Sequence, residues 1–192
     1  RIFNTESIKS IPGDAFGRIY EYFLMKFSMS GAGAQEGGEF FTPPSLVQLI
    51  VNFIEPKHGI VHDPACGSGG MFIQTAQFIN DKVKKSINES ISVYGTELKT
   101  NNTKLAKMNL AIHGLEGKII EDNSFFSDPH KLVNKCNFIM ANPPFNVKKV
   151  DKKKDYVIND PRLPFGLPNN DNGNYMWIQY FYSYLNKNGR AG

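Results

Sequence analysis

Short apolar runs and longer stretches of helical periodicity alternate along most of this chain. The runs at residues 60–62, 91–95, 118–121 and 137–141 predict β-strands. The stretches 71–79 and 100–113 place apolar residues at helical spacing between those runs, and 175–185 predicts a last helix rich in aromatic residues. Strands separated by helices are typical of a parallel sheet with helices on both faces. We therefore expect an α/β fold with a doubly wound, mostly parallel sheet.

The segment before the first of these strands predicts two further helices joined by a glycine-rich loop. Residues 13–29 carry apolar side chains at helical spacing, and the loop over 30–38 is rich in glycine and alanine. Thr42 is a candidate N-cap of the second helix, because proline is tolerated in the first turn that follows it. The buried stripe of this second helix is expected to consist of Leu46, Leu49, Ile50 and Phe53.

Size and composition restrict the class of protein. The 192 residues, 41% of them hydrophobic and 21% charged, are enough for one α/β domain. We expect no membrane span, because no apolar stretch approaches the roughly 20 residues that a membrane helix needs. The two cysteines, Cys66 and Cys136, lack metal-ligand spacing, so we expect no metal site and a reduced, cytoplasmic setting. The net charge of +4 permits a polyanionic partner without requiring one.

The most informative motif is the tetrapeptide that follows the run at 137–141. It consists of Asn142, Pro143, Pro144 and Phe145. An Asn side-chain oxygen and a backbone carbonyl held by consecutive prolines can each accept one N–H of an exocyclic amine such as that of adenine. Two fixed acceptors stabilise the positive charge that grows as this nitrogen attacks. The motif predicts methylation of such an amine, with Phe145 stacking on the base; a strand followed by a proline-rich turn is the alternative.

A glycine-rich loop joins the strand at 60–62 to the helix at 71–79. Glycines let the backbone approach a ligand closely and let the N-terminus of the helix point at it. The spacing differs from the dinucleotide fingerprint G-x-G-x-x-G, and an acidic residue at the strand tip suits a cationic or amine-bearing ligand, such as the methionine part of S-adenosylmethionine. The candidate cofactor residues here are Asp63, Ala65, Gly67, Ser68, Gly69 and Gly70; a generic glycine turn is the alternative.

Polar residues also end the next two strands. Glu97 can accept hydrogen bonds from both ribose hydroxyls of a nucleoside cofactor, or it can be a solvated charge at a strand end. Asp122 or Asn123 can bind the adenine amine of the same cofactor, and a capping or turn role is equally open.

Two other segments leave their role open on local grounds. The adjacent aromatics Phe40 and Phe41, before the second helix, are more typical of a core than of a ligand site. The basic run at 148–154 is either a solvated surface or a phosphate contact beside a loop that handles a base.

In their order and spacing, these motifs resemble the modification (methyltransferase) subunit of type I restriction–modification systems. The matching segments are residues 38–43, 63–70, 97, 142–145, 160–166 and 174–179. They extend over nearly the whole chain. The resemblance implies a Rossmann-like S-adenosylmethionine-dependent methyltransferase fold and the methylation of adenine N6 in DNA.

The resemblance also implies roles for particular residues. Catalysis would belong to Asn142, Pro143, Pro144 and Phe145. The cofactor S-adenosyl-L-methionine would contact the glycine loop, Glu97, and the segment Glu39, Phe40, Phe41, Thr42, Pro43 and Pro44, which reverses the local interpretation of the two aromatics. The implied partners are double-stranded DNA, a specificity subunit that reads it, a restriction (nuclease) subunit and a second copy of the chain.

The same resemblance predicts a chain truncated at both ends. Residues 1–37 would be the remnant of an N-terminal helical region with its linker, and residues 38–192 a partial catalytic domain whose final strands are missing. Residues 187–192 are typical of a turn leading to such a strand. The strand at 137–141 would then lie at an uncovered edge of the sheet, and the fragment alone would be poorly behaved and inactive.

Three alternatives to adenine methylation stay open. Cytosine N4 is a related substrate, and an amine of RNA or of protein glutamine suits a similar loop. A non-catalytic, cofactor-binding scaffold within a larger complex is the third. Replacement of Asn142 separates the scaffold from the enzymes, because a scaffold does not need that side chain.

Overall fold

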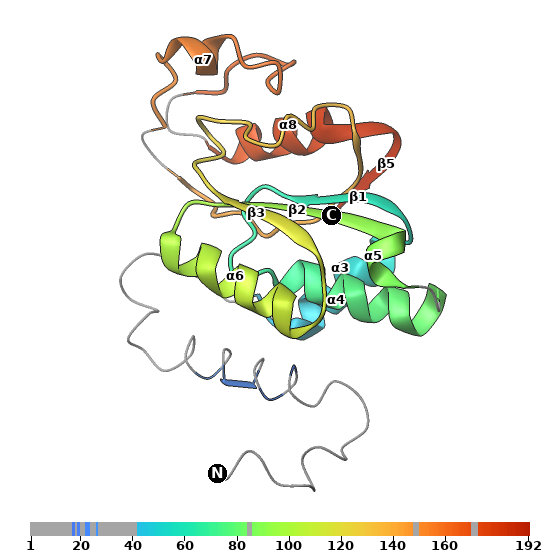
Figure 1. The fold of residues 1–192 in the computed structure, drawn as a ribbon. Coiled ribbons are helices and arrows are strands. Elements are labelled where there is room, and N and C mark those ends of the chain that lie inside the picture. Colours follow the sequence, from blue (N-terminus) through green and yellow to red (C-terminus); the bar gives the residue numbers. More distant parts are fainter. Residues whose placement is uncertain are drawn as a thin grey trace, which may run out of the picture.

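A five-stranded parallel sheet forms the centre of the molecule (Figure 1). This computed structural model describes residues 17, 19, 22, 23, 26, 42–83, 86–147, 150–169 and 173–192. The strand order is β3-β2-β1-β4-β5. The strands are β1 (Gly59–Asp63), β2 (Ile91–Glu97), β3 (Gly117–Glu121), β4 (Cys136–Ile139) and β5 (Leu185–Ala191). The predicted α/β fold with a doubly wound parallel sheet is confirmed.

Helices cover both faces of this sheet (Figure 1). One face carries α3 (Pro44–Ile54), α4 (Gly70–Phe78) and α6 (Thr100–Ile112). The opposite face carries α8 (Asn174–Tyr184), with the single turn α7 (Asp155–Ile158) farther out. Two short elements link α4 to β2, the π-helical turn η1 (Ile79–Val83) and α5 (Ile87–Ser90). No helix in the described ranges has the length and apolar character to cross a membrane.

Each face of the sheet has its own hydrophobic core. On the α4 side, Phe72 and Ile73 pack with strand residues such as Val61. On the α8 side, Ile139 of β4 packs with Met176 and Tyr180. Both sets are fully buried, so the sheet is apolar on both faces, as parallel sheets are.

Strand register brings the predicted motifs to one edge of the sheet. Asp63 at the end of β1 lies opposite Gly95 of β2, and Glu97 lies opposite Glu121 of β3. On the other side of β1, His62 lies opposite Ile139 of β4. The loops that follow β1, β2, β3 and β4 therefore gather at the carboxyl end of the sheet, where ligands bind in folds of this kind.

The predicted burial of helix α3 is wrong. Leu46, Leu49 and Phe53 are exposed and Ile50 is only partly buried. The buried residues of α3 are Val47, Val51 and Ile54. Apolar residues at helical spacing occupy two sides of this helix, and packing against α4 decides which side is covered.

The predicted N-cap of α3 is also wrong. Pro43 occupies the cap position, with extended backbone and without a side-chain hydrogen bond, and Pro44 is the first helical residue. Thr42 lies one residue too early to cap this helix, and its hydroxyl takes part in a contact at the candidate site instead.

Strand β4 does not lie at the edge of the sheet, contrary to the prediction. Residues 185–191 form β5, which pairs with β4 in parallel, and Gly192 exchanges backbone hydrogen bonds with Ile139 and Ala141. The ladder is irregular, since Cys136 pairs with Leu185 but Phe138 pairs with Arg190. Polar, glycine-containing residues form this bulge, which explains why the segment resembles a turn.

The other expected elements agree with the structure within a few residues, apart from short additions. Between residues 147 and 174, where the sequence is rich in Lys, Pro, Gly and Asn, the structure contains the turn α7. Gly17, Ile19, Tyr22, Phe23 and Lys26 are helical, as predicted for residues 13–29. The rest of that helix and the loop over 30–38 lie outside the described residues.

The substitution Gly95→Ala tests the close packing at the centre of the sheet. A Cβ at this position would lie 2.7 Å from Ile119 Cδ1, 2.9 Å from Cys66 Sγ and 3.1 Å from Phe72 Cε2. We expect the free energy of unfolding to fall by about 1–3 kcal/mol in chemical denaturation. Gly70→Ala is the control, since a Cβ there has no neighbour within 4 Å, and an unchanged Gly95→Ala protein would contradict the packing argument.

Candidate functional site

The glycine loop after β1 folds back on the end of β2. The Cys66 N–H donates to the Thr96 carbonyl at 3.0 Å, and the Gly69 N–H donates to the Cys66 carbonyl at 2.8 Å. Gly69 has a φ of 82°, and a Cβ added at this position would lie 3.1 Å from Leu110 Cδ1. A side chain is therefore disfavoured here twice, by backbone conformation and by space. The loop thereby brings its backbone to the N-terminus of α4, a favourable place for a polar ligand.

Asp63 is buried beneath this loop. One oxygen of its carboxyl group accepts a hydrogen bond from the Ala65 N–H at 2.9 Å. Burial raises the pKa of Asp63 to about 8, and the nearby Glu97 carboxylate adds to the rise. At neutral pH the Asp63 carboxyl group is therefore protonated, and in this form it accepts the hydrogen bond that holds the turn. Direct contact of Asp63 with a cofactor stays a prediction.

Glu97 joins the glycine loop to the turn that follows β2. Its Oε2 atom accepts a hydrogen bond from the Gly67 N–H, and its Oε1 atom accepts one from the Lys99 N–H, both at 2.9 Å. Asn102 Nδ2 donates to Oε1 at 3.4 Å. Each carboxylate oxygen can accept more than one hydrogen bond, so Glu97 can order the loop and still accept from ribose hydroxyls.

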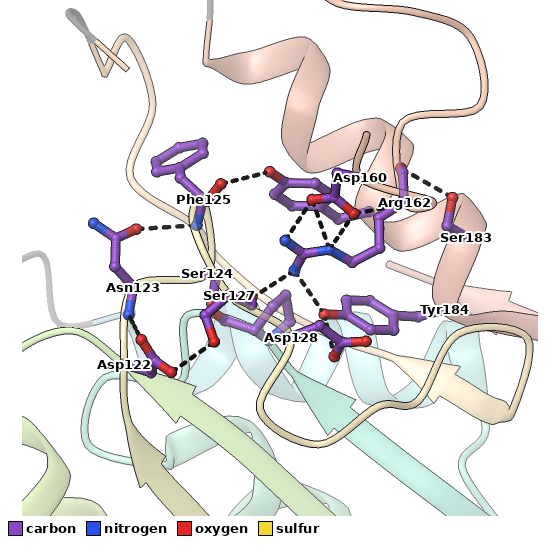
Figure 2. Close-up of polar contacts among 12 residues, drawn as sticks. Asp122, Asn123, Ser124, Phe125, Ser127, Asp128, Asp160, Arg162, Ser183 and Tyr184 are labelled. Atoms are coloured by element: carbon purple, nitrogen blue, oxygen red, sulfur yellow. Dashed lines mark hydrogen bonds and ion pairs between the residues drawn. The ribbon is translucent and has the colours of Figure 1, made fainter. Parts of the chain in front are cut away.

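Asp122 and Asn123 organise the turn after β3 (Figure 2). Asp122 accepts hydrogen bonds from the Asn123 N–H and from Ser127 Oγ, both at 2.7 Å. Asn123 Oδ1 accepts from the Phe125 N–H at 3.0 Å. The Ser124 hydroxyl donates to the Pro64 carbonyl at 2.5 Å, which ties this turn to the glycine loop. The choice between Asp122 and Asn123 as a contact for a cofactor adenine stays open.

The tetrapeptide at 142–145 leaves the sheet directly after β4. Phe145 is 65% exposed. Asn142 Nδ2 donates a hydrogen bond to Thr42 Oγ1 at 3.1 Å, although these residues are 100 positions apart. The structure therefore brings the start of α3 to the tetrapeptide, which sequence spacing did not show.

The predicted cofactor segment at 39–44 is described only in part. Pro43 and Pro44 are exposed at the start of α3, and Thr42 is half-buried. Glu39, Phe40 and Phe41 lie outside the described residues. The contact between Thr42 and Asn142 places the described part of the segment beside the tetrapeptide.

A buried ion pair that the sequence reasoning missed lies beside the turn after β3 (Figure 2). The Arg162 guanidinium contacts the Asp160 carboxylate at 2.6 Å, and both side chains are almost fully buried. Arg162 Nη1 also donates to the Ser127 carbonyl at 2.8 Å and to Tyr184 Oη at 2.9 Å. Tyr184 Oη in turn donates to Asp128 Oδ1 at 3.0 Å.

This network fixes the loop that follows the tetrapeptide to the segment after β3, at Ser127 and Asp128, and to α8, at Tyr184. Burial by itself lowers the pKa of Arg162, but the hydrogen bonds to Asp160, together with the electrostatic effects of Tyr184, Tyr180 and Asp160, raise it above its ordinary value. Opposite charges two positions apart were the available signal in the sequence. The polar composition of the surrounding segment favours an exposed pair, so this signal does not by itself predict burial.

The basic run at 148–154 serves partly in protein contacts. Lys152 is buried, and its ammonium donates to the Pro168 carbonyl at 3.1 Å and to the Asn169 carbonyl. Lys154 Nζ lies 4.5 Å from the centre of the Phe126 ring. Residues 148 and 149 lie outside the described residues, and phosphate contact by this run stays a prediction.

Comparison with known proteins gives consistent matches over most of the chain. The family model described as N-6 DNA Methylase matches residues 12–192. The type I restriction enzyme HindI methylase subunit of Haemophilus influenzae is 40% identical over 98% of this chain and 41% of its own length. The MjaIX methylase subunit of Methanocaldococcus jannaschii is 42% identical over 93% of this chain and 32% of its own length.

A solved structure shows the same fold. The type I restriction–modification system methyltransferase subunit from Streptococcus thermophilus aligns with a TM-score of 0.78 at 22% identity. The alignment covers 95% of this chain and 39% of that one. The chain thus spans less than half the length of each of these three relatives.

The substitution Arg162→Leu tests the buried ion pair. It leaves the Asp160 carboxylate buried without its partner, so we expect the free energy of unfolding to fall by about 3–5 kcal/mol. Arg190→Leu is the matched control, because the Arg190–Glu55 pair is half-exposed and should contribute less than about 1 kcal/mol. Equal effects of the two substitutions in urea denaturation would contradict a special role for Arg162.

The raised pKa of Asp63 predicts a pH dependence of stability. Folded Asp63 keeps its proton up to about pH 8, whereas the unfolded chain loses it near the ordinary value of 3.8. Folding therefore takes up a proton between these values, and this group makes the free energy of unfolding fall as pH rises, by at most ~1.4 kcal/mol per pH unit.

Asp63→Asn removes this titration while keeping an oxygen for the Ala65 N–H. The stability difference between the variant and the unmodified protein should shift in favour of the variant as pH rises from about 5 to about 8 in urea denaturation. A difference that is constant over this range would show that Asp63 titrates normally in the folded protein.

Proposed function

Because this chain belongs to the N-6 DNA methylase family, we propose that it is the catalytic part of a type I modification subunit. The proposed reaction transfers a methyl group from S-adenosyl-L-methionine to N6 of adenine in DNA. The observation that carries the proposal is the position of residues 142–145. They follow β4, which is paired with β1, and β1 leads into the glycine loop.

The glycine loop and Glu97 fit the proposed cofactor. Gly67 and Gly69 both have positive φ, and no Cβ limits access to the backbone at these positions. Glu97 is anchored through Gly67 and Lys99, with acceptor capacity left for ribose hydroxyls. We assign the cofactor contacts to residues 39–44, to the loop 63–70 and to Glu97, with Asp122 or Asn123 at the adenine.

We assign the chemistry at the target amine to residues 142–145. Bound S-adenosylmethionine supplies an electrophilic methyl group on a sulfonium. The target adenine must leave the duplex, at a cost of a few kcal/mol in stacking and pairing, and the exposed Phe145 ring offers a new stacking surface.

Asn142 Oδ1 and the Pro143 carbonyl then accept the two amino hydrogens. These acceptors draw the nitrogen lone pair out of conjugation and stabilise the positive charge that forms on it. The surplus proton leaves to water after transfer, so no strong general base is required.

The proposed partners follow from the type I systems named for the relatives. We propose that the full-length protein acts on double-stranded DNA in the cytoplasm, together with a specificity subunit, a restriction subunit and a second copy of itself. The similarity to type I restriction enzyme methylase subunits supports this assembly.

The substitution Asn142→Ala tests the function. It removes the amide oxygen that accepts a hydrogen bond from the amine, so we expect methyl transfer to fall by at least about 10²-fold. Affinity for S-adenosylmethionine should stay within a few-fold. The assay uses the full-length protein co-expressed with its specificity subunit, unmethylated DNA and mass spectrometry of the nucleosides.

Asn186→Ala is the control, because Asn186 lies in β5 and its contact is a local bond to the Asn188 N–H. Detection of N4-methylcytosine as the product would show that the target base is cytosine and not adenine. No methylated base, despite cofactor binding by the unmodified protein, would favour a non-DNA substrate or a scaffold.

A further inference from the structure

Contacts from two other elements hold the tetrapeptide at 142–145. We propose that Thr42 and Trp177 are positioning residues that determine which oxygens of this loop remain available to the target amine. This inference rests on the proposed function. The two contacts are the hydrogen bond from Asn142 Nδ2 to Thr42 Oγ1, at 3.1 Å, and the one from Trp177 Nε1 to the Pro144 carbonyl, at 3.2 Å.

Thr42 orients the amide of Asn142. This amide has a donor end and an acceptor end, and only the acceptor end suits an amine that offers N–H bonds. Because Thr42 holds the Nδ2 end, the Oδ1 end faces the other way. The anchor is itself fixed, since α3 begins two residues later and buries Val47 and Val51 in the core.

Trp177 donates a hydrogen bond to one of the two proline carbonyls of the tetrapeptide. Its indole nitrogen can only donate, and it donates to the carbonyl of Pro144. The orientation of the indole is set by packing, because the ring is 6% exposed and lies 4.5 Å from Phe125 and 5.8 Å from Tyr180, centre to centre. Packing of the buried ring therefore holds the N–H donor in place, and the position of this donor does not depend on the conformation of the tetrapeptide.

The residue pair after the tetrapeptide reinforces this arrangement. The Asn146 N–H donates to Asn174 Oδ1 at 2.8 Å, and Asn174 Nδ2 donates to Asn146 Oδ1 at 3.3 Å. Asn146 has a φ of 56°, a left-handed conformation that Asn tolerates better than most residues. The N-terminal turn of α8 thus holds the loop at two points, Pro144 and Asn146.

The result is a loop with two free acceptors. Within the part of the chain that the structure describes, Asn142 Oδ1 and the Pro143 carbonyl accept no hydrogen bond, while the Pro144 carbonyl is occupied. The two free oxygens are the ones that the proposed reaction needs. Fixing them before the amine arrives lowers the reorganisation required in the transition state.

The test removes the two hydrogen bonds one at a time. Trp177→Phe keeps an aromatic ring and removes the N–H, and Thr42→Val keeps the shape and removes the hydroxyl. In the full-length protein with its specificity subunit, each should lower kcat by about 10–100-fold, because small displacements of reacting groups have effects of this size. For Trp177→Phe, which lies outside the segments assigned to the cofactor, the Kd for S-adenosylmethionine and the KM for DNA should change no more than a few-fold. Thr42→Ser should restore kcat, since it restores the hydroxyl.

Tyr182→Phe is the matched control on α8. Tyr182 is 61% exposed on the same helix, and removal of its hydroxyl should leave kcat unchanged. Unchanged kcat in both Trp177→Phe and Thr42→Val would overturn the proposal. In Trp177→Phe, a fall in kcat matched by an equal loss of cofactor affinity would also overturn it, because it would indicate a general structural role. No N6-methyladenine from the unmodified protein would instead refute the proposed function itself.

Discussion

Strands β1 and β4 pair in parallel, with Val61 opposite Phe138 and His62 opposite Ile139. The chain visits β1, β2 and β3 in one direction across the sheet and then returns to place β4 on the other side of β1. Loops that leave two adjacent strands towards opposite faces open a crevice at such a switch point. The glycine loop follows one of these strands and the tetrapeptide at 142–145 follows the other. Their proximity depends on this pairing.

Backbone groups and carboxylates connect the strand ends on the proposed cofactor side. Glu97 accepts hydrogen bonds from Gly67 and Lys99, so the end of β2 and the glycine loop are a single hydrogen-bonded unit. Ser124 adds the turn after β3 through the Pro64 carbonyl. The strand-end residues therefore order one another, and a ligand meets a loop that is already folded.

Aromatic and charged side chains of α8 and its surroundings organise the segment around the tetrapeptide at 142–145. The Arg162 guanidinium lies 4.3 Å from the centre of the Tyr180 ring, and Tyr180 packs on Trp177. Trp177 in turn contacts the Pro144 carbonyl. A continuous series of contacts thus runs from the buried Asp160–Arg162 pair to the tetrapeptide at 142–145. This series connects the proposed chemistry to a buried ion pair outside the tetrapeptide.

Local sequence was sufficient to predict the strands β1 to β4, the helices α4, α6 and α8, and the residues at the strand ends. These elements have strong periodicity, and the polar residues after them lie at one edge because parallel strands share a direction. The buried face of α3, the pairing of β5 with β4, and the role of Thr42 depended on contacts between distant segments. Leu46 and Val47 are equally apolar, and only packing against α4 distinguishes them. Residues 187–192 have the composition of a turn, yet pairing with the backbone groups of β4 makes residues 187–191 part of a strand. Thr42 meets Asn142 across 100 positions, a contact that no local pattern encodes.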